Sequence, residues 1–66
     1  MTIVVNGDHA PIPAQPTVAA LVAELTEASR GVAVALNGEV VPRSAWADTG
    51  LTDGDRVEVL TAAQGG

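Results

Sequence analysis

The chain of 66 residues contains no cysteine, no lysine, one histidine, and neither phenylalanine nor tyrosine. Without cysteine it has no disulfide scaffold, no cysteine-ligated zinc site and no thiol nucleophile of its own. His9 alone cannot form a histidine cluster around a metal ion. We therefore expect no metal site and no bound cofactor, and no nucleophile–base pair indicates an enzyme.

Long hydrophobic runs are also missing from the sequence. No apolar stretch approaches the length that a membrane-spanning helix requires. The N-terminus has no basic segment before an apolar one, so it does not resemble a signal peptide. We expect a cytoplasmic protein with no membrane partner.

Basic residues are scarce, since three arginines stand against eight aspartates and glutamates, which gives a formal net charge of -5. The arginines are scattered along the chain and do not form the basic cluster that nucleic-acid binding requires. No nucleic-acid partner is therefore expected. The acidic surface would suit encounter with a basic protein partner, or it serves solubility alone.

Apolar residues make up 47% of the chain, and this proportion indicates one globular domain over residues 1–66. Thr2–Val5 is β-branched throughout and precedes Asn6-Gly7, a strong hairpin signal. The returning strand, about Asp8–Ile12, is expected at a sheet edge because Pro11 and Pro13 lack backbone donors.

One amphipathic helix is predicted after Pro16, with Thr17 as its N-cap. Apolar residues recur there with helical spacing at Val18, Leu21, Val22 and Leu25. Arg30 suits the negative end of the helix dipole, and Gly31 is a natural residue to follow the last turn.

The second half of the chain is predicted to form three short strands. In order, we expect a strand at Val32–Leu36, a turn at Asn37-Gly38, a strand at Glu39–Val41, a helical turn at Ser44–Ala47, a turn at Asp53-Gly54-Asp55, a strand at Arg56–Leu60 and a tail at 61–66. Trp46 is expected to anchor the long connection by packing beneath it.

The resulting order, β-β-α-β-β-β, predicts an α+β fold in which one helix covers a mixed sheet of four to five strands. A helix held across a sheet by two hairpins is the β-grasp, or ubiquitin-like, arrangement. The core is expected to combine the helix stripe and Trp46 with Ile3, Val5, Val34, Leu36, Val57 and Val59. Alternation then directs Val4 and Leu60 to the opposite, open face, near the root of the tail. We predict that both are partner-binding residues, although single exposed hydrophobic residues are also ordinary.

The chain ends in Gly65-Gly66. Two glycines add little to the stability of a fold, but they are suited to reaction in an enzyme active site. Without Cβ atoms these residues can pass through a channel too narrow for side chains. An enzyme could thus bring the Gly66 carboxylate to the α-phosphate of ATP. A frayed terminus is the alternative, since chain ends are often poorly ordered and glycine tolerates this. We expect the residues from about Ala62 onward to be mobile in the free protein.

Four segments, taken in order, resemble the ThiS family of sulfur carriers of thiamine biosynthesis. They are Ile3-Val4-Val5-Asn6-Gly7, Ala35-Leu36-Asn37-Gly38 followed by Val41-Pro42-Arg43 and Trp46, Asp53-Gly54-Asp55, and Gly65-Gly66. The Val-Pro-Arg-x-x-Trp stretch is the most specific of them. Gln64 departs from the small or apolar residues common before the glycines.

This resemblance implies a protein co-substrate without a catalytic site. A ThiF-type adenylyltransferase would use ATP and Mg²⁺ to form an acyl-adenylate on Gly66, with Gly65 giving access. Sulfur from a cysteine desulfurase or other persulfide donor would then leave a Gly66 thiocarboxylate. That group would donate sulfur to a ThiG-type thiazole synthase, and we expect the free carrier to be a monomer.

Two other functions stay open at this point. One is a MoaD-like carrier for molybdopterin or another sulfurated metabolite, and the other is a non-covalent ubiquitin-like interaction module. Among the remaining residues, His9 is expected to be an exposed bystander, and Asp53-Gly54-Asp55 lacks the other ligand positions of a calcium loop. Arg43 either caps local carbonyls or contacts a partner.

Overall fold

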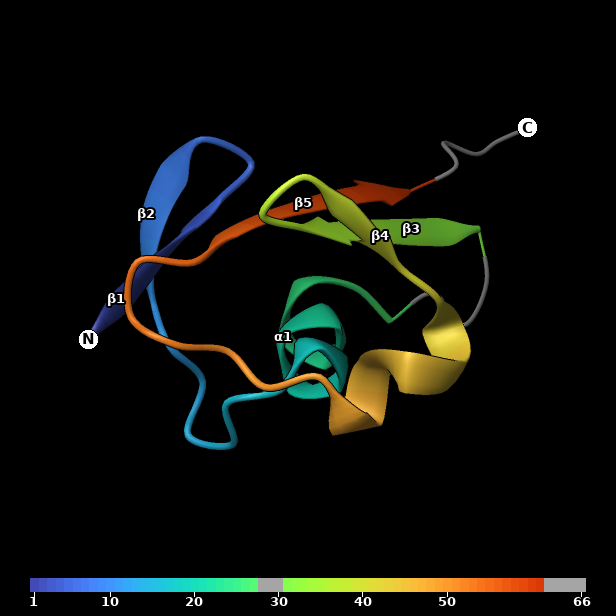
Figure 1. Cartoon of the computed structure of the whole chain (residues 1–66), viewed down its shortest axis with the longest axis horizontal. Coiled ribbons are helices and arrows are strands. Elements are labelled where there is room, and N and C mark those ends of the chain that lie inside the picture. The colour runs from blue at the N-terminus through green and yellow to red at the C-terminus, as the bar shows by residue number, and fades with distance from the viewer. Residues whose placement is uncertain (28–30, 62–66) are drawn as a thin grey trace.

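The computed structural model describes residues 1–27 and 31–61. A five-stranded mixed sheet lies on one side, and α1 and the 3-10 helix η1 both lie on the other (Figure 1). The elements are β1 (Thr2–Val5), β2 (Asp8–Pro11), α1 (Val18–Leu25), β3 (Val32–Leu36), β4 (Glu39–Val41), η1 (Arg43–Asp48) and β5 (Arg56–Thr61). The predicted β-grasp arrangement of the α+β class is confirmed.

The strand order is β2-β1-β5-β3-β4, so the last strand of the chain occupies the centre of the sheet. β5 runs parallel to β1 and antiparallel to β3, while the two hairpins are antiparallel. β5 also includes Thr61, one residue more than the predicted strand. Thr61, predicted as the first residue of the tail, therefore belongs to the sheet.

The two hairpins turn at Asn-Gly pairs, as the sequence predicts. Asn6 and Gly7 have φ values of 51° and 87°, and Asn37 and Gly38 have values of 52° and 88°. Positive φ at both central positions is the type I′ geometry that matches strand twist, and asparagine and glycine adopt it at least cost. β2 ends at Pro11 and lies at the sheet edge, where its missing donor leaves no partner unsatisfied.

Helix α1 begins as predicted but ends early. The Oγ1 atom of Thr17 accepts a hydrogen bond from the Ala20 amide at 3.1 Å, which caps the first turn. The helix ends at Leu25, since Thr26 is already extended, with φ -154° and ψ 150°. Gly31 has φ 75° but lies well beyond that cap, so the prediction that it follows the last turn is wrong.

The early end has a physical reason in the apolar stripe. Val18, Leu21 and Val22 are buried. Leu25 is 49% exposed, so the prediction that it belongs to the core is wrong. The next two residues, Thr26 and Glu27, are polar, so continuing the helix through them gives little apolar packing to offset the cost of ordering them. Arg30, predicted near the helix end, lies outside the described residues.

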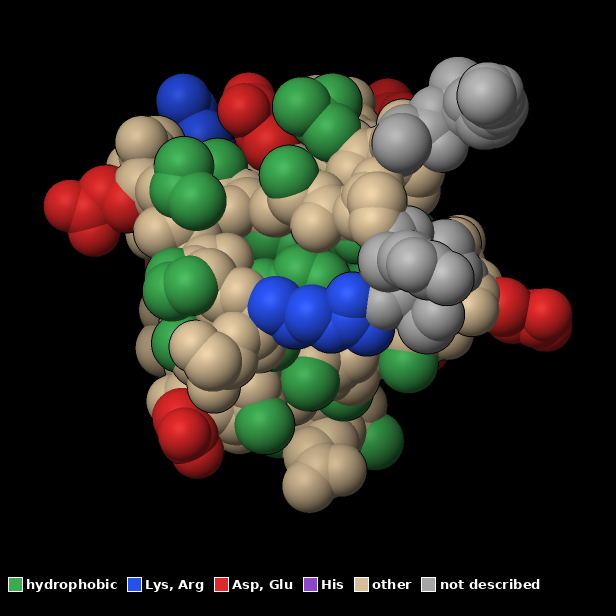
Figure 2. Space-filling model, turned by 90° about the vertical axis from the view of Figure 1, so that its right-hand side faces the viewer, with side chains coloured by type: hydrophobic (Ala, Val, Ile, Leu, Met, Phe, Trp, Pro, Cys, Tyr) green, Lys and Arg blue, Asp and Glu red, His purple; other side chains and the backbone are tan. Residues whose placement is uncertain are grey.

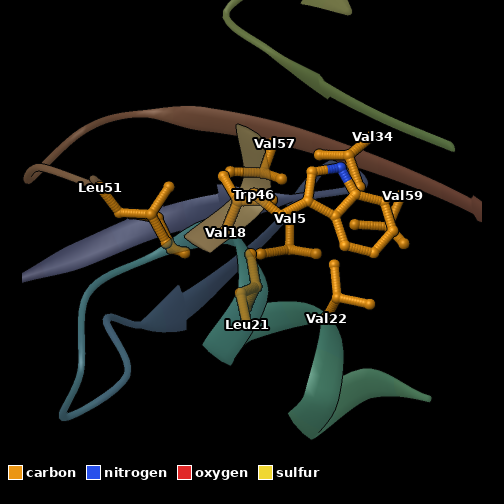
Figure 3. Packing of buried hydrophobic residues seen from close by; sticks show 10 residues of the cluster. Val5, Val18, Leu21, Val22, Val34, Trp46, Leu51, Val57 and Val59 are labelled. Carbon is orange, nitrogen blue, oxygen red and sulfur yellow. The ribbon is translucent and has the colours of Figure 1, made fainter. Parts of the chain in front are cut away.

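The core lies between the sheet and the two helices (Figure 3). Its buried members are Ile3, Val5, Val18, Leu21, Val22, Val34, Trp46, Leu51, Val57 and Val59. Predicted Leu36 is half-buried at the margin, and Leu51 is a member that the prediction missed. No polar side chain is buried among the described residues. Apolar packing alone therefore fills this small core.

The connection from β4 to β5 is held by Trp46 and by the start of α1. Trp46 is 8% exposed, and its Nε1 donates to the Val41 carbonyl at 2.9 Å, so its predicted anchoring role is confirmed. The Val18 amide donates to the Thr49 carbonyl at 3.0 Å, and the Leu51 amide donates to the Pro16 carbonyl at 2.8 Å. These contacts place Leu51 against the core.

Candidate functional site

The best candidate site is the end of β5, because this strand leads to the predicted reactive terminus. Gly65 and Gly66, together with the predicted mobility of the tail, lie outside the described residues. The structure instead describes the root of the tail, up to Thr61 in β5. Figure 1 shows this root at the end of the molecule opposite the free end of β1.

Beside this root, the open face of the sheet is apolar. Leu60 is 69% exposed, which confirms the predicted orientation of its side chain. Ala33 lies directly opposite it on β3, and Ala35 pairs with Val40 of β4. Alternation along the strands places all four residues on the same face. We refer to Ala33, Ala35, Val40 and Leu60 as the open-face patch.

Val40 is the largest member of this patch that the sequence analysis did not identify. It is 78% exposed, more than Leu60. A signal was available in the sequence, because Val40 and Val41 are adjacent apolar residues of one strand, and adjacent side chains point to opposite faces. Val41 packs against the core margin, so Val40 must face outward.

Val4, the second predicted partner-binding residue, lies elsewhere on the same face. It is half-buried and pairs with Arg56 at the start of β5, not with its end. Leu60 lies four residue positions after Arg56 in β5, which is about 13 Å along a strand. The predicted position of Val4 next to the root of the tail is therefore wrong. Val4 instead lines a shallow hollow with His9, Arg56 and Glu58.

Charged side chains border the open-face patch along β5. Glu58 is exposed on β5 between Arg56 and Leu60, directly opposite Ala35. Figure 2 views the end of the molecule where β5 finishes, with the open face along the top, and shows hydrophobic side chains beside acidic ones on that rim. An apolar centre with a polar margin is the usual composition of a protein-binding surface.

The Asp53-Gly54-Asp55 segment forms the turn that starts β5, as predicted. The Asp53 Oδ1 atom accepts from the Thr2 amide at 2.8 Å, and the Asp55 Oδ2 atom accepts from the Thr52 amide at 2.8 Å. The hydrogen bond from the Thr52 amide, assisted by the Asn37 side chain, lowers the pKa of Asp55. The Asp53 carboxylate thus connects the turn to β1, and the Asp55 carboxylate closes the turn itself. His9 is exposed as predicted.

Arg43 makes a local contact. Its guanidinium carbon lies 5.4 Å from the centroid of the Trp46 ring, within the range of a cation–π interaction. This contact was not among the roles predicted for Arg43. Arg43 thus covers Trp46 at the start of η1.

The described residues contain no group of three or more His, Cys, Asp or Glu side chains that could hold a metal ion. Over the same residues, no helix has the length and hydrophobicity needed to cross a membrane. What the described chain offers is a strand end with an adjacent apolar surface.

Comparison with known proteins gives the family. The sequence profile of the ThiS family matches residues 2–66. The chain belongs to the ThiS family. A crystal structure of a thiamine biosynthesis protein (ThiS) from Geobacter metallireducens has 38% identity and a TM-score of 0.79, with complete coverage of both chains. The NMR structure of a thiamine biosynthesis protein from the same organism gives the same identity and TM-score and is covered to 88%.

Two curated relatives differ in length. The chain is 33% identical to the sulfur carrier protein ThiS of Escherichia coli, with full coverage of both proteins. It is 42% identical to a thiazole synthase of Paramagnetospirillum magneticum over all 66 of its residues, which are only 20% of that protein. A ThiS-family sequence thus also occurs as one fifth of a larger protein.

Proposed function

We propose that this chain is a sulfur carrier in the synthesis of the thiamine thiazole. The observation that carries the proposal is the ThiS family match over residues 2–66, together with the full-length similarity to a sulfur carrier protein. The fold agrees, because β5 leads from the centre of the sheet directly to the C-terminal residues.

The proposed chemistry takes place on the α-carboxylate of Gly66. A carboxylate oxygen attacks the α-phosphate of ATP, pyrophosphate leaves, and an acyl-adenylate forms. A persulfide sulfur then attacks the acyl carbon and displaces AMP, and reduction of the resulting S–S bond by a thiol leaves the thiocarboxylate. The activating enzyme, not the carrier, binds ATP and Mg²⁺. The carrier is thus a co-substrate without a catalytic site, acting in the cytoplasm.

Three protein partners follow from this chemistry. They are a ThiF-type adenylyltransferase, a thiazole synthase of the ThiG type, and a cysteine desulfurase or other persulfide donor. The relative that joins a ThiS-family sequence to a larger thiazole synthase supports the second of these. We assign docking to Leu60 and Val40, whose exposed fractions are 69% and 78%, and a lesser role to Val4.

The test is to move the carboxylate without changing the fold. Adding one alanine after Gly66 displaces the carboxylate by up to ~3.5 Å, one extended residue. A near-attack geometry tolerates far less, since an error of about 1 Å can cost ~100-fold in rate. The extended protein should melt at the wild-type temperature yet fail to support ATP–pyrophosphate exchange by the activating enzyme.

Two further proteins sharpen this test. One alanine added before Met1 is the matched control and should support normal exchange. Gly65→Val should fail like the extended protein, because a β-branched side chain would have to enter the channel. Intact-mass measurement of protein from cells should show an oxygen-for-sulfur exchange at the C-terminus. Normal exchange and sulfur transfer by the extended protein would contradict the carrier function and favour a non-covalent interaction module.

A further inference from the structure

The side chains of the two turn asparagines bond to β5 from opposite sides. Asn6 directly follows β1 and Asn37 directly follows β3, and each has a positive φ at its turn. A type I′ turn requires only their backbone conformation. The amide groups are therefore free to make additional contacts, and both do so with the strand that leads to the C-terminus.

Asn6 continues the β1–β5 ladder after β1 has turned away. The main-chain ladder runs from the Val4 amide to the Asp55 carbonyl at 2.9 Å, and then from the Asn6 amide to the Val57 carbonyl at 2.9 Å. At the next position, the Oδ1 atom of Asn6 accepts from the Val59 amide at 2.9 Å, and Nδ2 donates to the Val59 carbonyl at 3.1 Å. One side chain thus replaces a strand residue and satisfies both main-chain groups of Val59.

Asn37 makes the corresponding contacts at the opposite end of β5. Its main-chain amide donates to the Arg56 carbonyl at 2.7 Å, and its side-chain Oδ1 atom accepts from the Arg56 main-chain amide at 2.9 Å. Its Nδ2 donates to Asp55 at 3.1 Å. Asn37 therefore makes one side-chain hydrogen bond to β5 and one to the Asp55 carboxylate just before it. Both side-chain bonds of Asn6 go to Val59, at the end of β5 that faces the tail.

We propose that Asn6 is a positioning residue for sulfur-carrier activation, because its side chain holds Val59 and thereby fixes the end of β5. This inference rests on the proposed function. Val59 immediately precedes Leu60, an exposed residue of the open-face patch, and Leu60 is followed by Thr61, the last residue of the strand. Holding Val59 orders these two residues before a partner binds.

The expected benefit is preorganisation. If the strand end were loose, binding would have to order Val59, Leu60 and Thr61 as well as the tail, and each ordered residue costs conformational entropy. Once bound, the tail would reach the activating enzyme by the same path. Loss of the Asn6 side chain should therefore raise the KM for the carrier and leave kcat nearly unchanged.

The experiment compares Asn6→Gly with Asn37→Gly in the full chain. Glycine keeps the positive φ of either turn without strain, so the two variants share the same gain in unfolded-chain entropy and differ in the side-chain hydrogen bonds that they lose. We expect Asn6→Gly to raise the KM in ATP–pyrophosphate exchange about tenfold, the effect of two neutral hydrogen bonds. Its kcat should stay within about twofold of the wild-type value. Asn37→Gly should lower the melting temperature similarly but leave the KM unchanged.

Amide hydrogen exchange provides a second readout that does not depend on the partner enzyme. In Asn6→Gly the Val59 amide should exchange about tenfold faster relative to the Val57 amide, because it has lost its acceptor. Asn6→Asp is a second variant that keeps the turn conformation and the acceptor but removes the donor to the Val59 carbonyl. The carboxylate oxygen that replaces Nδ2 faces the Val59 carbonyl oxygen, and two acceptors repel, so Asn6→Asp should raise the KM at least as much as Asn6→Gly.

The outcomes separate the two proposals. Equal KM changes in the two glycine variants, or an unchanged Val59 amide in Asn6→Gly, would overturn the role of Asn6. If wild-type protein supports no exchange with the activating enzyme, the proposed carrier function fails instead. The hydrogen-exchange comparison would then still decide whether Asn6 holds the end of β5.

Discussion

The two faces of the sheet are built from the same strands but contact different surroundings. On the covered face, Ile3, Val34 and Val57 are nearly inaccessible to solvent beneath α1 and η1. On the open face, Val40 and Leu60 are largely exposed, although Val41 beside Val40 is partly buried and Val59 beside Leu60 is buried. The difference teaches that the same residue types serve stability on one face and are available for recognition on the other.

The covered face depends most on Trp46, whose indole closes the core from η1. Trp46→Ala should lower the free energy of unfolding by about 3–5 kcal/mol, the usual cost of removing a large buried aromatic side chain. A small domain has on the order of 5–15 kcal/mol in total, so the variant should be largely unfolded near 37 °C. Urea unfolding monitored by circular dichroism measures this. Trp46→Phe keeps most of the volume and should lose less; equal losses in both variants would show that packing is not the main contribution.

The same change on the two faces tests the comparison directly. Val34 is 2% exposed and Val40 is 78% exposed, and the two residues lie on neighbouring strands. Val34→Ala should lower the free energy of unfolding by about 1.5–3 kcal/mol. Val40→Ala should change it by no more than about 0.5 kcal/mol. Similar losses at both positions, measured by chemical denaturation, would remove the distinction between the faces.

A charge introduced on the open face should weaken partner binding without lowering the stability of the fold. Leu60→Arg places a guanidinium in the open-face patch, where burial against a partner would leave it unpaired. We expect at least about tenfold weaker binding to the activating enzyme and to the synthase, or roughly 1.4 kcal/mol. The melting temperature should stay at the wild-type value. Val4→Arg is the comparison variant and should have a smaller effect, and unchanged affinity of Leu60→Arg for both enzymes in a titration would remove Leu60 from the surface.

The smallest expected effect is on the pH dependence of stability, and it comes from the turn that starts β5, which belongs to neither face of the sheet. The Thr52 amide and the Asn37 side chain lower the pKa of Asp55 in the folded protein. Its stabilisation is therefore present above the unfolded-state pKa of about 3.9 and is lost as pH falls through the lower folded value. Asp55→Asn should flatten the decline in stability below about pH 4, measured by thermal melts across pH. A decline as steep as that of the wild type would exclude this contribution.

Local patterns determined most of the elements because their causes are local. Asparagine and glycine adopt positive φ, threonine caps a helix start, and alternating valines form strands, so turns and strands could be predicted within one or two residues. The end of α1 could not be predicted in this way, because it depends on which helix residues pack against the sheet, and Thr26 is already extended. Leu25 has the right spacing for the stripe and still remains 49% exposed.

The sequence by itself determined the β-grasp order and the outward direction of Leu60. Each of these depends on residue type or on alternation along the strands. Only the tertiary structure decided that Val40 joins Leu60 in one patch through Ala33 and Ala35, whereas Val4 pairs with the start of β5, because these pairings depend on sheet order and register. It also decided that Asn6 holds Val59, a contact between residues 53 positions apart. Turn chemistry explains why asparagine stands at position 6, but only packing of β1 beside β5 gives its side chain a strand to hold.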